Sequence, residues 1–371
     1  MQRIKFLGHA KIFFLVFTII PGLSLPLLGQ SRSVGDSVTT QALNEVLIQS
    51  QLKNIRLTSA TPVQIFKGEA LERLNSLSVA DALRFFSGVQ IKDYGGVGGL
   101  KTINIRSMGS QHTAVFYDGL QITNAQNGQV DLGKFSLDNL ELIELYNGQR
   151  TDLLQSASAF SSASSIFLKT KAPDFSGGKS VKGLFNLKGG SFALFNPSAL
   201  LQFRLNDQLS ASFSTSLMNA NGKYKFRYTN GVYDTTAVRS NGDVYSLRFE
   251  AGLDGRLKNN GHWHLKFYSY DSERGLPGAV VSQKFDYSQR LWDKNLFVQA
   301  SMEKKVNKRY SFLINSKYAD NQLRYLDPEI TNLNGFLENK YKEEEAYFSL
   351  ANKYELTSFW EVSLATDYRY N

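Results

Sequence analysis

Long stretches in the second half of the chain alternate apolar and polar side chains. Between Leu209 and Leu217, apolar residues or threonine occupy the odd positions, and serine occupies every even position from 210 to 216. The same alternation runs through residues 244–254 and 360–369. Successive side chains of a β-strand point to opposite faces, so each segment has one apolar and one polar face. The pattern predicts antiparallel β-strands.

The alternation predicts nine strands with two kinds of connection between them. The expected strands are 181–190, 196–206, 208–220, 242–257, 260–271, 292–306, 308–322, 342–355 and 358–370. Short connections near 206–208, 259–261, 306–308 and 356–358 alternate with longer polar ones around 220–241, 271–291 and 324–341. This plan is typical of outer-membrane barrels, whose tilted strands need about 9–11 residues to span the bilayer. A soluble sandwich, whose strands also alternate, is the alternative interpretation.

Nine strands do not close a bacterial outer-membrane barrel. Single-chain barrels of this kind have an even number of strands, and an open edge in lipid would leave backbone groups without hydrogen bonds. The last expected strand also runs up to Asn371 without a following loop. We therefore expect the chain to be the front part of a longer protein.

Aromatic residues divide the chain into two compositions. Residues 180–371 hold 32 of the 47 aromatic residues. Trp263, Tyr310 and Trp360 lie next to predicted turns, which is the arrangement of the aromatic girdles in membrane barrels. A stretch with proline, glycine and serine at 173–179 marks the boundary between the two compositions. We expect a separate domain before this boundary and a barrel sheet after it.

The first 30 residues have the three parts of a secretory signal. Arg3, Lys5 and Lys11 accompany the apolar run 12–20, and small and polar residues follow up to Gln30. This order is typical of a signal peptide. A membrane anchor is the alternative, although the run is shorter than the roughly 20 residues that a spanning helix needs. Three of the nine net positive charges lie in this segment, so nucleic acid is not an expected partner.

Residues 60–175 predict a small α+β domain. Ser78 can cap a helix in which Asp81 stands three residues later, and Gly88 can end it. The buried stripe of this helix is expected to contain Val79, Ala82, Leu83 and Phe86. Strands are expected within 101–107 and 113–122, and residues 138–148 form another amphipathic stretch.

The order of motifs in residues 78–149 resembles the plug domain of TonB-dependent outer-membrane receptors. That family has a helix ending in a PGV-like turn, an IRG-like strand, a strand ending in DG and an IE-containing stretch. The matching residues are Ser87-Gly88-Val89, Ile105-Arg106-Ser107, Tyr117-Asp118-Gly119 and Ile143-Glu144. The resemblance implies four plug motif residues with turn or ion-pair roles, namely Arg106, Asp118, Gly119 and Glu144. Ser107 departs from the family pattern, which usually has glycine there.

A segment between the expected signal peptide and the plug-like region resembles the TonB box of the same family. Its candidate partner-binding residues are Leu43, Asn44, Glu45, Val46, Leu47, Ile48 and Gln49. Residues of this kind favour an extended strand, which can add to the edge of a partner's sheet. The resemblance implies that the partner is a TonB-type energy-transducing protein. An ordinary strand is the alternative interpretation.

A stretch around residues 272–280 resembles a loop of the cobalamin receptors in this family. Its candidate ligand-loop residues are Arg274, Gly275, Leu276, Pro277 and Gly278. Proline and glycine otherwise need only form a rigid turn. The resemblance implies a small to medium ligand such as cobalamin, and a siderophore or haem is the alternative.

Few residues of the chain suit catalysis or metal binding. The chain has no cysteine, which excludes disulfides and iron–sulfur clusters, and it has four histidines. His262 and His264 share a strand face without a third nearby ligand, so we interpret them as lumen-facing polar residues. The three glutamates at 343–345 are expected to form a solvated strand entry. The glycines within 95–99 lack the GK[ST] ending of a phosphate loop and predict a flexible loop. We expect no enzyme, cofactor or metal site.

These parts combine into one expected architecture. A signal peptide at 1–30 precedes an N-terminal extension at 31–54, an α+β plug domain at 55–175 and the N-terminal part of an antiparallel transmembrane β-barrel at 180–371. Barrels whose lumen is plugged have about 22 strands. The resemblance implies a receptor, exported to the outer membrane and in contact with its lipid, that imports a scarce ligand with energy from TonB. A surface-binding barrel protein that imports nothing is the alternative.

Overall fold

The computed structural model describes residues 61–124, 128–175, 177–258, 261–281, 284–330, 333 and 335–371. The chain divides into two compact units, Met1–Ser50 and Gln51–Asn371, and every described residue belongs to the second. The expected signal peptide and the TonB-box-like segment therefore lie outside the described residues. The described part contains a small first domain, residues 61–175, followed by a nine-stranded sheet.

The first domain is built on a five-stranded sheet with the order β1-β6-β7-β4-β5. β4 and β7 pair in parallel, and the other neighbours pair antiparallel. Its strands are β1 (Val63–Lys67), β4 (Thr113–Tyr117), β5 (Leu120–Ile122), β6 (Leu140–Tyr146) and β7 (Ser164–Thr170), with a separate hairpin of β2 (Val89–Asp93) and β3 (Lys101–Ile105). The helices are α2 (Glu69–Arg73) and α3 (Val79–Leu83), and 3-10 turns are η1 (Gly96–Gly98), η2 (Ser110–His112), η3 (Leu132–Lys134) and η4 (Ala157–Phe160). The expected α+β class is confirmed.

The N-terminal cap of α3 has the geometry that the sequence predicts. The Ser78 hydroxyl accepts a hydrogen bond from the Asp81 backbone N–H at 3.3 Å and donates one to the Asp81 carboxylate at 2.7 Å. The expected apolar stripe is buried, from Val79 to Phe86. The helix is shorter than expected, because it ends at Leu83 and the chain reaches Gly88 through turns.

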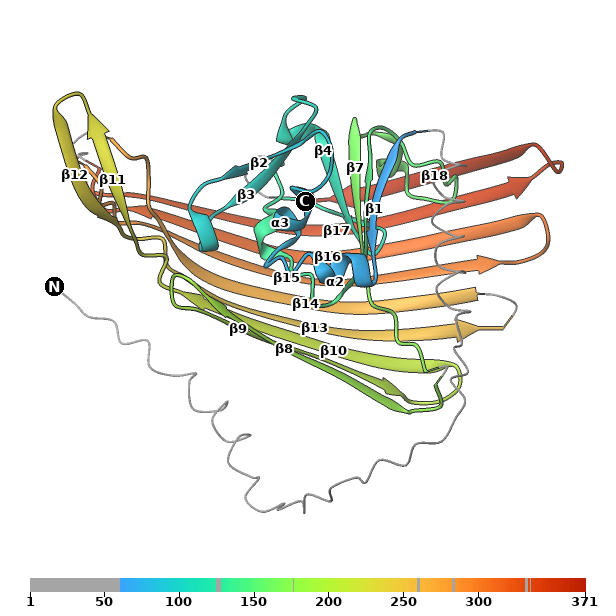
Figure 1. The fold of residues 1–371 in the computed structure, drawn as a ribbon. Coiled ribbons are helices and arrows are strands. Elements are labelled where there is room, and N and C mark those ends of the chain that lie inside the picture. The colour runs from blue at the N-terminus through green and yellow to red at the C-terminus, as the bar shows by residue number, and fades with distance from the viewer. Residues whose placement is uncertain are drawn as a thin grey trace, which may run out of the picture. The chain divides into compact units, whose positions relative to one another are not determined.

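The second part of the chain forms one antiparallel sheet of nine strands, so the predicted number of strands is confirmed. The strands lie in the order β8-β9-β10-β13-β14-β15-β16-β17-β18, and each pairs with its neighbours along the chain (Figure 1). Their bounds are β8 (Val181–Gly190), β9 (Leu194–Arg204), β10 (Leu209–Ala220), β13 (Val244–Leu257), β14 (Gly261–Leu276), β15 (Gln289–Lys305), β16 (Tyr310–Asp327), β17 (Leu337–Glu355) and β18 (Glu361–Tyr370). Within the described residues the sheet does not close into a barrel.

Four of these strands are longer than the alternation predicts. β14 to β17 contain 16, 17, 18 and 19 residues, because they continue into stretches that the sequence assigns to polar connections. Ion pairs between neighbouring strands accompany these extensions. Arg290 lies 2.7 Å from Glu273, and Arg324 lies 2.7 Å from Glu338. Alternation of apolar residues misses such strand ends because both of their faces are polar.

The segment 220–241, expected to be a polar connection, contains a β-hairpin. Its strands are β11 (Tyr224–Asn230) and β12 (Tyr233–Arg239), which pair only with each other. Gly231 has a φ of 60°, which suits the tight turn between them. On one side of the hairpin the rings of Phe226 and Tyr228 pack against Phe285, with centroids 5.7 and 5.2 Å apart.

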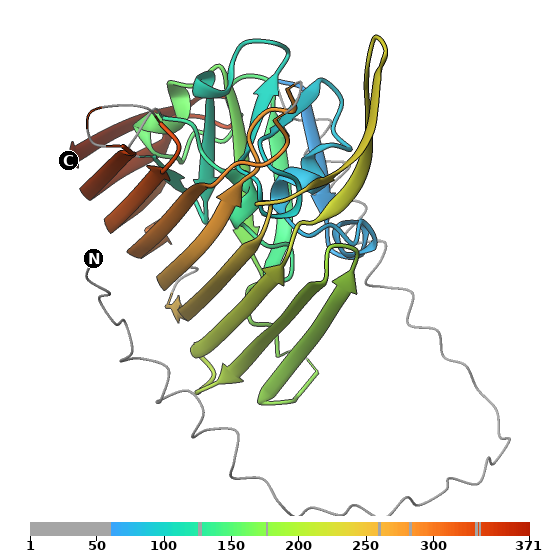
Figure 2. The same cartoon turned by 90° about the vertical axis from the view of Figure 1, so that its left-hand side faces the viewer.

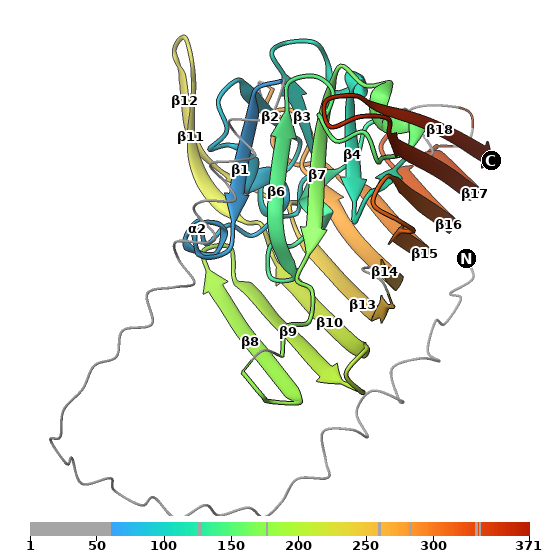
Figure 3. The same cartoon turned by 90° about the vertical axis from the view of Figure 1, so that its right-hand side faces the viewer.

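The first domain lies against one face of the curved sheet, as the views in Figures 2 and 3 show. We call this face the inner face and the opposite one the outer face. Outer-face side chains such as Leu247 and Phe249 are 38% and 41% exposed. The inner face is polar along much of its length, but Tyr268 and Phe297 on it are buried in a common core with the first domain. Among the described residues, no helix has the length and apolar character needed to cross a membrane.

Candidate functional site

The Asp118-Gly119 motif forms the turn between β4 and β5 and binds the sheet. Asp118 and Gly119 have φ values of 48° and 86°, a backbone conformation that asparagine, aspartate and glycine tolerate best. The Asp118 carboxylate accepts hydrogen bonds from the Thr170 backbone N–H at 2.8 Å and from Lys266 Nζ at 2.5 Å. His264 Nε2 lies 3.9 Å away. This motif residue therefore joins the first domain to β14.

The electrostatic surroundings of Asp118 favour its charged form. Burial alone raises the pKa of this carboxyl, but the charges of Lys266 and His264 and the hydrogen bonds that it accepts outweigh burial. The pKa of Asp118 is therefore held below its ordinary value. The side chains of Lys266 and Asp118 are only 3% and 10% exposed, so this ion pair lies inside the interface. Both residues also form hydrogen bonds with Thr170.

Glu250 of β13 completes the same cluster. It accepts hydrogen bonds from the Tyr117 hydroxyl at 2.7 Å and from the Asn139 side-chain amide at 3.0 Å, and it lies 3.5 Å from Lys266 Nζ. We call Tyr117, Asp118, Glu250 and Lys266 the central cluster. Two of these residues belong to the first domain and two to the sheet. Sequence reasoning identified only Asp118, because alternation places Glu250 and Lys266 on the polar face but does not name their partners.

An aromatic contact lies beside the central cluster. The ring of Tyr268 stacks on Phe297 with centroids 4.5 Å apart, and Tyr117 and Phe135 pack around this pair. All four rings are buried. We expected hydrophilic residues along the whole inner face, and this expectation is wrong at these strand positions. The reason is that this part of the sheet faces protein rather than water.

The candidate ligand-loop residues divide between a strand and a connection. Arg274, Gly275 and Leu276 belong to β14, so their expected place in a loop is wrong, whereas Pro277 and Gly278 follow the strand. The guanidinium of Arg274 lies 2.9 Å from Asp131 of the first domain and 3.4 Å from Asp293 of β15. It also donates to the backbone oxygen of Gly98 at 3.3 Å, and the Arg274 residue is only 2% exposed. Arg274 binds the first domain directly.

The glycine-rich turn at 95–99 is packed against β13 and against the connection that follows β14. A Cβ atom on Gly98 would lie 2.4 Å from Cβ of Val244, and one on Gly95 would lie 3.3 Å from Cδ of Pro277. The Gly98 position therefore admits no larger side chain without displacing β13. In place of the loop that the sequence predicts, the structure has the 3-10 turn η1 at this position.

The expectation of a solvated entry at the three glutamates is wrong for Glu345. This side chain is fully buried, accepts a hydrogen bond from Thr123 and lies 2.7 Å from Lys317 and 3.1 Å from Arg369. Glu344 points to the exposed side instead, beside Lys342. Strand alternation separates these neighbours, because adjacent side chains lie on opposite faces.

The remaining motif residues do not join this interface. Arg106 and Ser107 form a turn after β3 with φ values of 49° and 61°, which explains why a glycine suits the second position. Glu144 lies in β6, 3.9 Å from Arg150. Burial raises the pKa of Glu144, and the charge of Arg150 opposes this only in part. Within the described residues, Arg106 and Glu144 share no ion pair.

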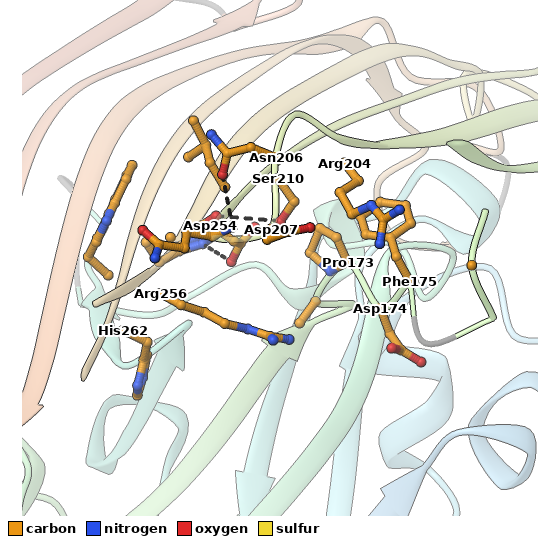
Figure 4. A pocket seen from close by; sticks show the side chains of 17 residues that line it. Pro173, Asp174, Phe175, Arg204, Asn206, Asp207, Ser210, Asp254, Arg256 and His262 are labelled. Carbon is orange, nitrogen blue, oxygen red and sulfur yellow. Dashed lines mark hydrogen bonds and ion pairs between the residues drawn. The ribbon is translucent and has the colours of Figure 1, made fainter. Parts of the chain in front are cut away.

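A cavity of about 630 Å³ lies at the end of the sheet next to the 172–178 linker (Figure 4). The linker, the ends of β9 and β13 and the starts of β10 and β14 line it. His264 Nδ1 lies 2.8 Å from Asp254 in this cavity, and His262 lies 3.7 Å from Glu303. Across the described residues, no three side chains of His, Cys, Asp or Glu are grouped so that they could hold a metal ion.

Comparisons with known proteins agree with this arrangement. Residues 56–161 match the family model of the TonB-dependent receptor plug domain. The vitamin B12 transporter BtuB of Vibrio vulnificus is 24% identical over 227 residues, which are 61% of this chain and 34% of the relative. The BtuB protein of Photobacterium profundum is 22% identical over 280 residues, 72% of this chain and 44% of the relative. The chain spans less than half the length of these curated relatives.

Solved structures share the fold of the described part. The siderophore receptor PiuA from Acinetobacter baumannii superposes with a TM-score of 0.58 at 14% identity, covering 83% of this chain and 45% of that one. The copper transporter OprC gives a TM-score of 0.61 at 13% identity, covering 84% of this chain and 46% of that one. At such low identities these likenesses speak for the fold.

A plug domain bound to the inner face of a large antiparallel sheet defines the class of TonB-dependent receptors. Residues 56–161 match the plug domain of this class, and the described part of the chain shares the fold of its solved members. Within the class, its sequence similarity is to the cobalamin receptors. The relatives found are receptors and transporters, not enzymes. From here on, the first domain is called the plug.

Proposed function

We propose that this protein is an outer-membrane receptor that imports a scarce ligand with energy delivered by a TonB-type protein. The observation that carries the proposal is the plug bound to the inner face of the sheet through the central cluster and Arg274. Such a plug blocks the lumen of a wide barrel, so passage requires the plug to move. The outer membrane has no energy source of its own, and an energised partner has to supply the work.

The proposed contact with the partner is the segment Leu43–Gln49. It precedes β1, which is an edge strand of the plug sheet and pairs only with β6. A force applied before β1 therefore reaches the plug at an edge strand that has a single neighbour in the sheet. β-strand addition to the partner's sheet would transmit this force through backbone hydrogen bonds.

Deletion of Leu43–Gln49 from the receptor tests energised import. We expect the deletion to abolish ligand accumulation in cells while ligand binding to whole cells stays at the wild-type level. Deleting the seven residues Ser31–Ser37 of the same extension is the matched control, and uptake should persist. Unchanged uptake in the Leu43–Gln49 deletion would contradict energised import and would favour a surface-binding barrel protein.

We propose a cobalamin-like ligand, because the curated relatives of this chain are vitamin B12 transporters. A metal chelate such as a siderophore is the second candidate, favoured by the fold shared with a siderophore receptor. Equilibrium binding of cyanocobalamin and of a ferric siderophore to receptor-expressing cells separates the two. Saturable binding of cyanocobalamin alone supports the first candidate, and saturable binding of the ferric siderophore alone excludes it.

A further inference from the structure

A small cavity lies between the plug and the sheet, near the Val244 end of β13. Its volume is about 30 Å³. The plug contributes two turns to its wall, and the sheet contributes the inner faces of β9, β10, β13 and β14. The residues around it include Gly98, Lys134, Ser216, Ser246, Arg248 and Arg274.

The wall of this cavity carries positive charge and no carboxylate. Lys134, Arg248 and Arg274 are three of its residues, and their side chains are 7%, 10% and 3% exposed. The carboxylates that neutralise them, Asp131, Asp293 and Glu250, are absent from the wall. The three cations are thus held in place by acids that do not line the cavity.

The cavity wall carries hydrogen-bond donors that are not fully used. Arg274 Nε is buried and has no hydrogen-bond partner among the described residues, although the two terminal nitrogens of the same guanidinium are bound. Arg248 donates to the Lys134 backbone oxygen and to the Ser216 hydroxyl oxygen. Because Ser216 accepts this bond, its own proton remains to be donated. A buried donor without a partner is destabilising by about 1–3 kcal/mol, more for a charged group.

The size of the cavity limits what can satisfy these donors. A space of about 10–15 Å³ on this measure holds one water, so the cavity admits one or two waters or one small ion. A water would satisfy one donor but would bring two protons that need acceptors. A halide-sized anion accepts from several donors at once, and charge-assisted hydrogen bonds to guanidinium are stronger than neutral ones. The donor-rich wall favours the anion.

We propose that this cavity binds one small inorganic anion, with chloride as the physiological species. The anion accepts hydrogen bonds from Arg274 Nε and the Ser216 hydroxyl, and it is attracted by Arg248. Its ligands come from β10, β13 and β14, while the plug closes the site with the turns at Gly98 and Lys134. The bound anion therefore strengthens the seating of the plug on the sheet. This site is independent of which ligand the receptor imports.

Diffraction from crystals of the purified receptor grown in sodium bromide tests the site directly. We expect one anomalous bromide peak inside the cavity, within hydrogen-bond distance of Arg274 Nε. Density for water alone at this position, without an anomalous signal, overturns the proposal.

Thermal unfolding in detergent tests the same site in solution. Going from gluconate to chloride at constant ionic strength should raise the Tm of the wild-type receptor by a few degrees, with saturation. Ser246→Asp places a carboxylate in the cavity and should remove the chloride response. Ser214→Asp is the matched control, because Ser214 lies on the same strand face as Ser216 but does not line the cavity, and it should keep the response.

Each outcome of the thermal-unfolding experiment either supports or overturns the proposed anion site. Equal wild-type Tm values in the two salts overturn the proposal, and together with a bromide peak they would mean an adventitious ion only. A chloride response that survives in Ser246→Asp places the responsible anion elsewhere and also overturns it. If Ser246→Asp does not fold, Ser246→Val, which fills the cavity with apolar volume, serves as the second variant with the same expected loss of response.

Discussion

Individual ion pairs hold the plug against the sheet, and few of them were predictable from the sequence. Asp118 was expected to lie in a turn or an ion pair, and it does both. Its partner Lys266 belongs to a strand 148 residues later. Alternation assigns a residue to a face, but pairing across two domains depends on how the domains dock. For this reason Glu345, expected to be solvated, is buried, and Thr123 of the plug donates a hydrogen bond to it.

Asp118→Asn should weaken the seating of the plug. The change leaves Lys266 buried with Glu250 as its remaining acid, and removing one partner of a buried pair destabilises proteins by about 3 kcal/mol. The free energy of unfolding of the purified receptor, from denaturant titration, measures this. Asp234→Asn is the control, because its pair with Arg227 is exposed and should contribute little. Equal effects of the two substitutions would contradict the structural role of Asp118.

The pH dependence of stability follows from the same residue. Because the folded-state pKa of Asp118 is lowered, its contribution is fully present above the unfolded value of about 3.9 and is lost as the pH falls through the folded value. The wild-type Tm should therefore decline below about pH 4, and Asp118→Asn should flatten part of this decline. Tm values of both proteins from pH 3 to 6 provide the measurement. Parallel curves would exclude Asp118 as a contributor.

At the scale of elements, periodicity predicted the strands of the sheet and missed the hairpin. The nine strands bury one face, so their two-residue period is visible in the sequence. The strand β11 has the same period, with Tyr224, Phe226 and Tyr228 alternating with polar residues, but it is only seven residues long and lies in a stretch that was assigned to a polar connection. Its aromatic face packs against Phe285 in another connection, which the sequence does not indicate. The helix α3 was predictable because its capping contact, between Ser78 and Asp81, is local.

The role of the connection after β14 in ligand binding can be tested by substituting a glycine within it. Gly278 has a φ of 69°, and a Cβ atom there would lie 2.7 Å from the Tyr287 ring. Gly335 has a φ of 71° but no atom within 4 Å of such a Cβ. Alanine at either position is strained by about 1–2 kcal/mol, but only Gly278→Ala displaces its surroundings. We expect Gly278→Ala to weaken ligand binding to cells at least several-fold and Gly335→Ala to leave it near wild type.

Equal affinities in these two variants would contradict a role of this connection in ligand binding. Immunoblots of outer-membrane fractions establish that both variants are present in equal amounts. The comparison is informative because backbone strain is similar at the two positions and the steric contact is not.

For the whole molecule, the two faces of the sheet should differ in chemical access. The chain has no cysteine, so single cysteines can be introduced into a clean background. In membranes, Phe249→Cys on the outer face should react with a lipophilic maleimide and poorly with a charged one. Val232→Cys, at the fully exposed tip of the hairpin, should react with both, and Ser272→Cys on the buried inner face with neither before unfolding. Mass spectrometry of the intact protein counts the labels.

A Phe249→Cys protein that reacts with the charged reagent as fast as Val232→Cys would contradict the membrane-facing assignment of the outer face. The overall architecture was predictable from the sequence because plug motifs and strand alternation are both local signals. The docking of the plug on the sheet was not, since it rests on contacts between residues that are far apart in the chain.

The extended ends of β14 to β17 indicate how far the bilayer reaches along the outer face of the sheet. On the outer face of β15, Leu296 and Val298 are followed toward the start of the strand by Lys294, which pairs with Asp271. Charged side chains on the lipid side are tolerated near the interface and destabilising at the midplane. The boundary between the apolar core of the bilayer and water is therefore expected between Leu296 and Lys294 on the outer face. The strand ends beyond this level extend out of the bilayer, so under the proposed function they are the first part of the sheet that a ligand from outside contacts.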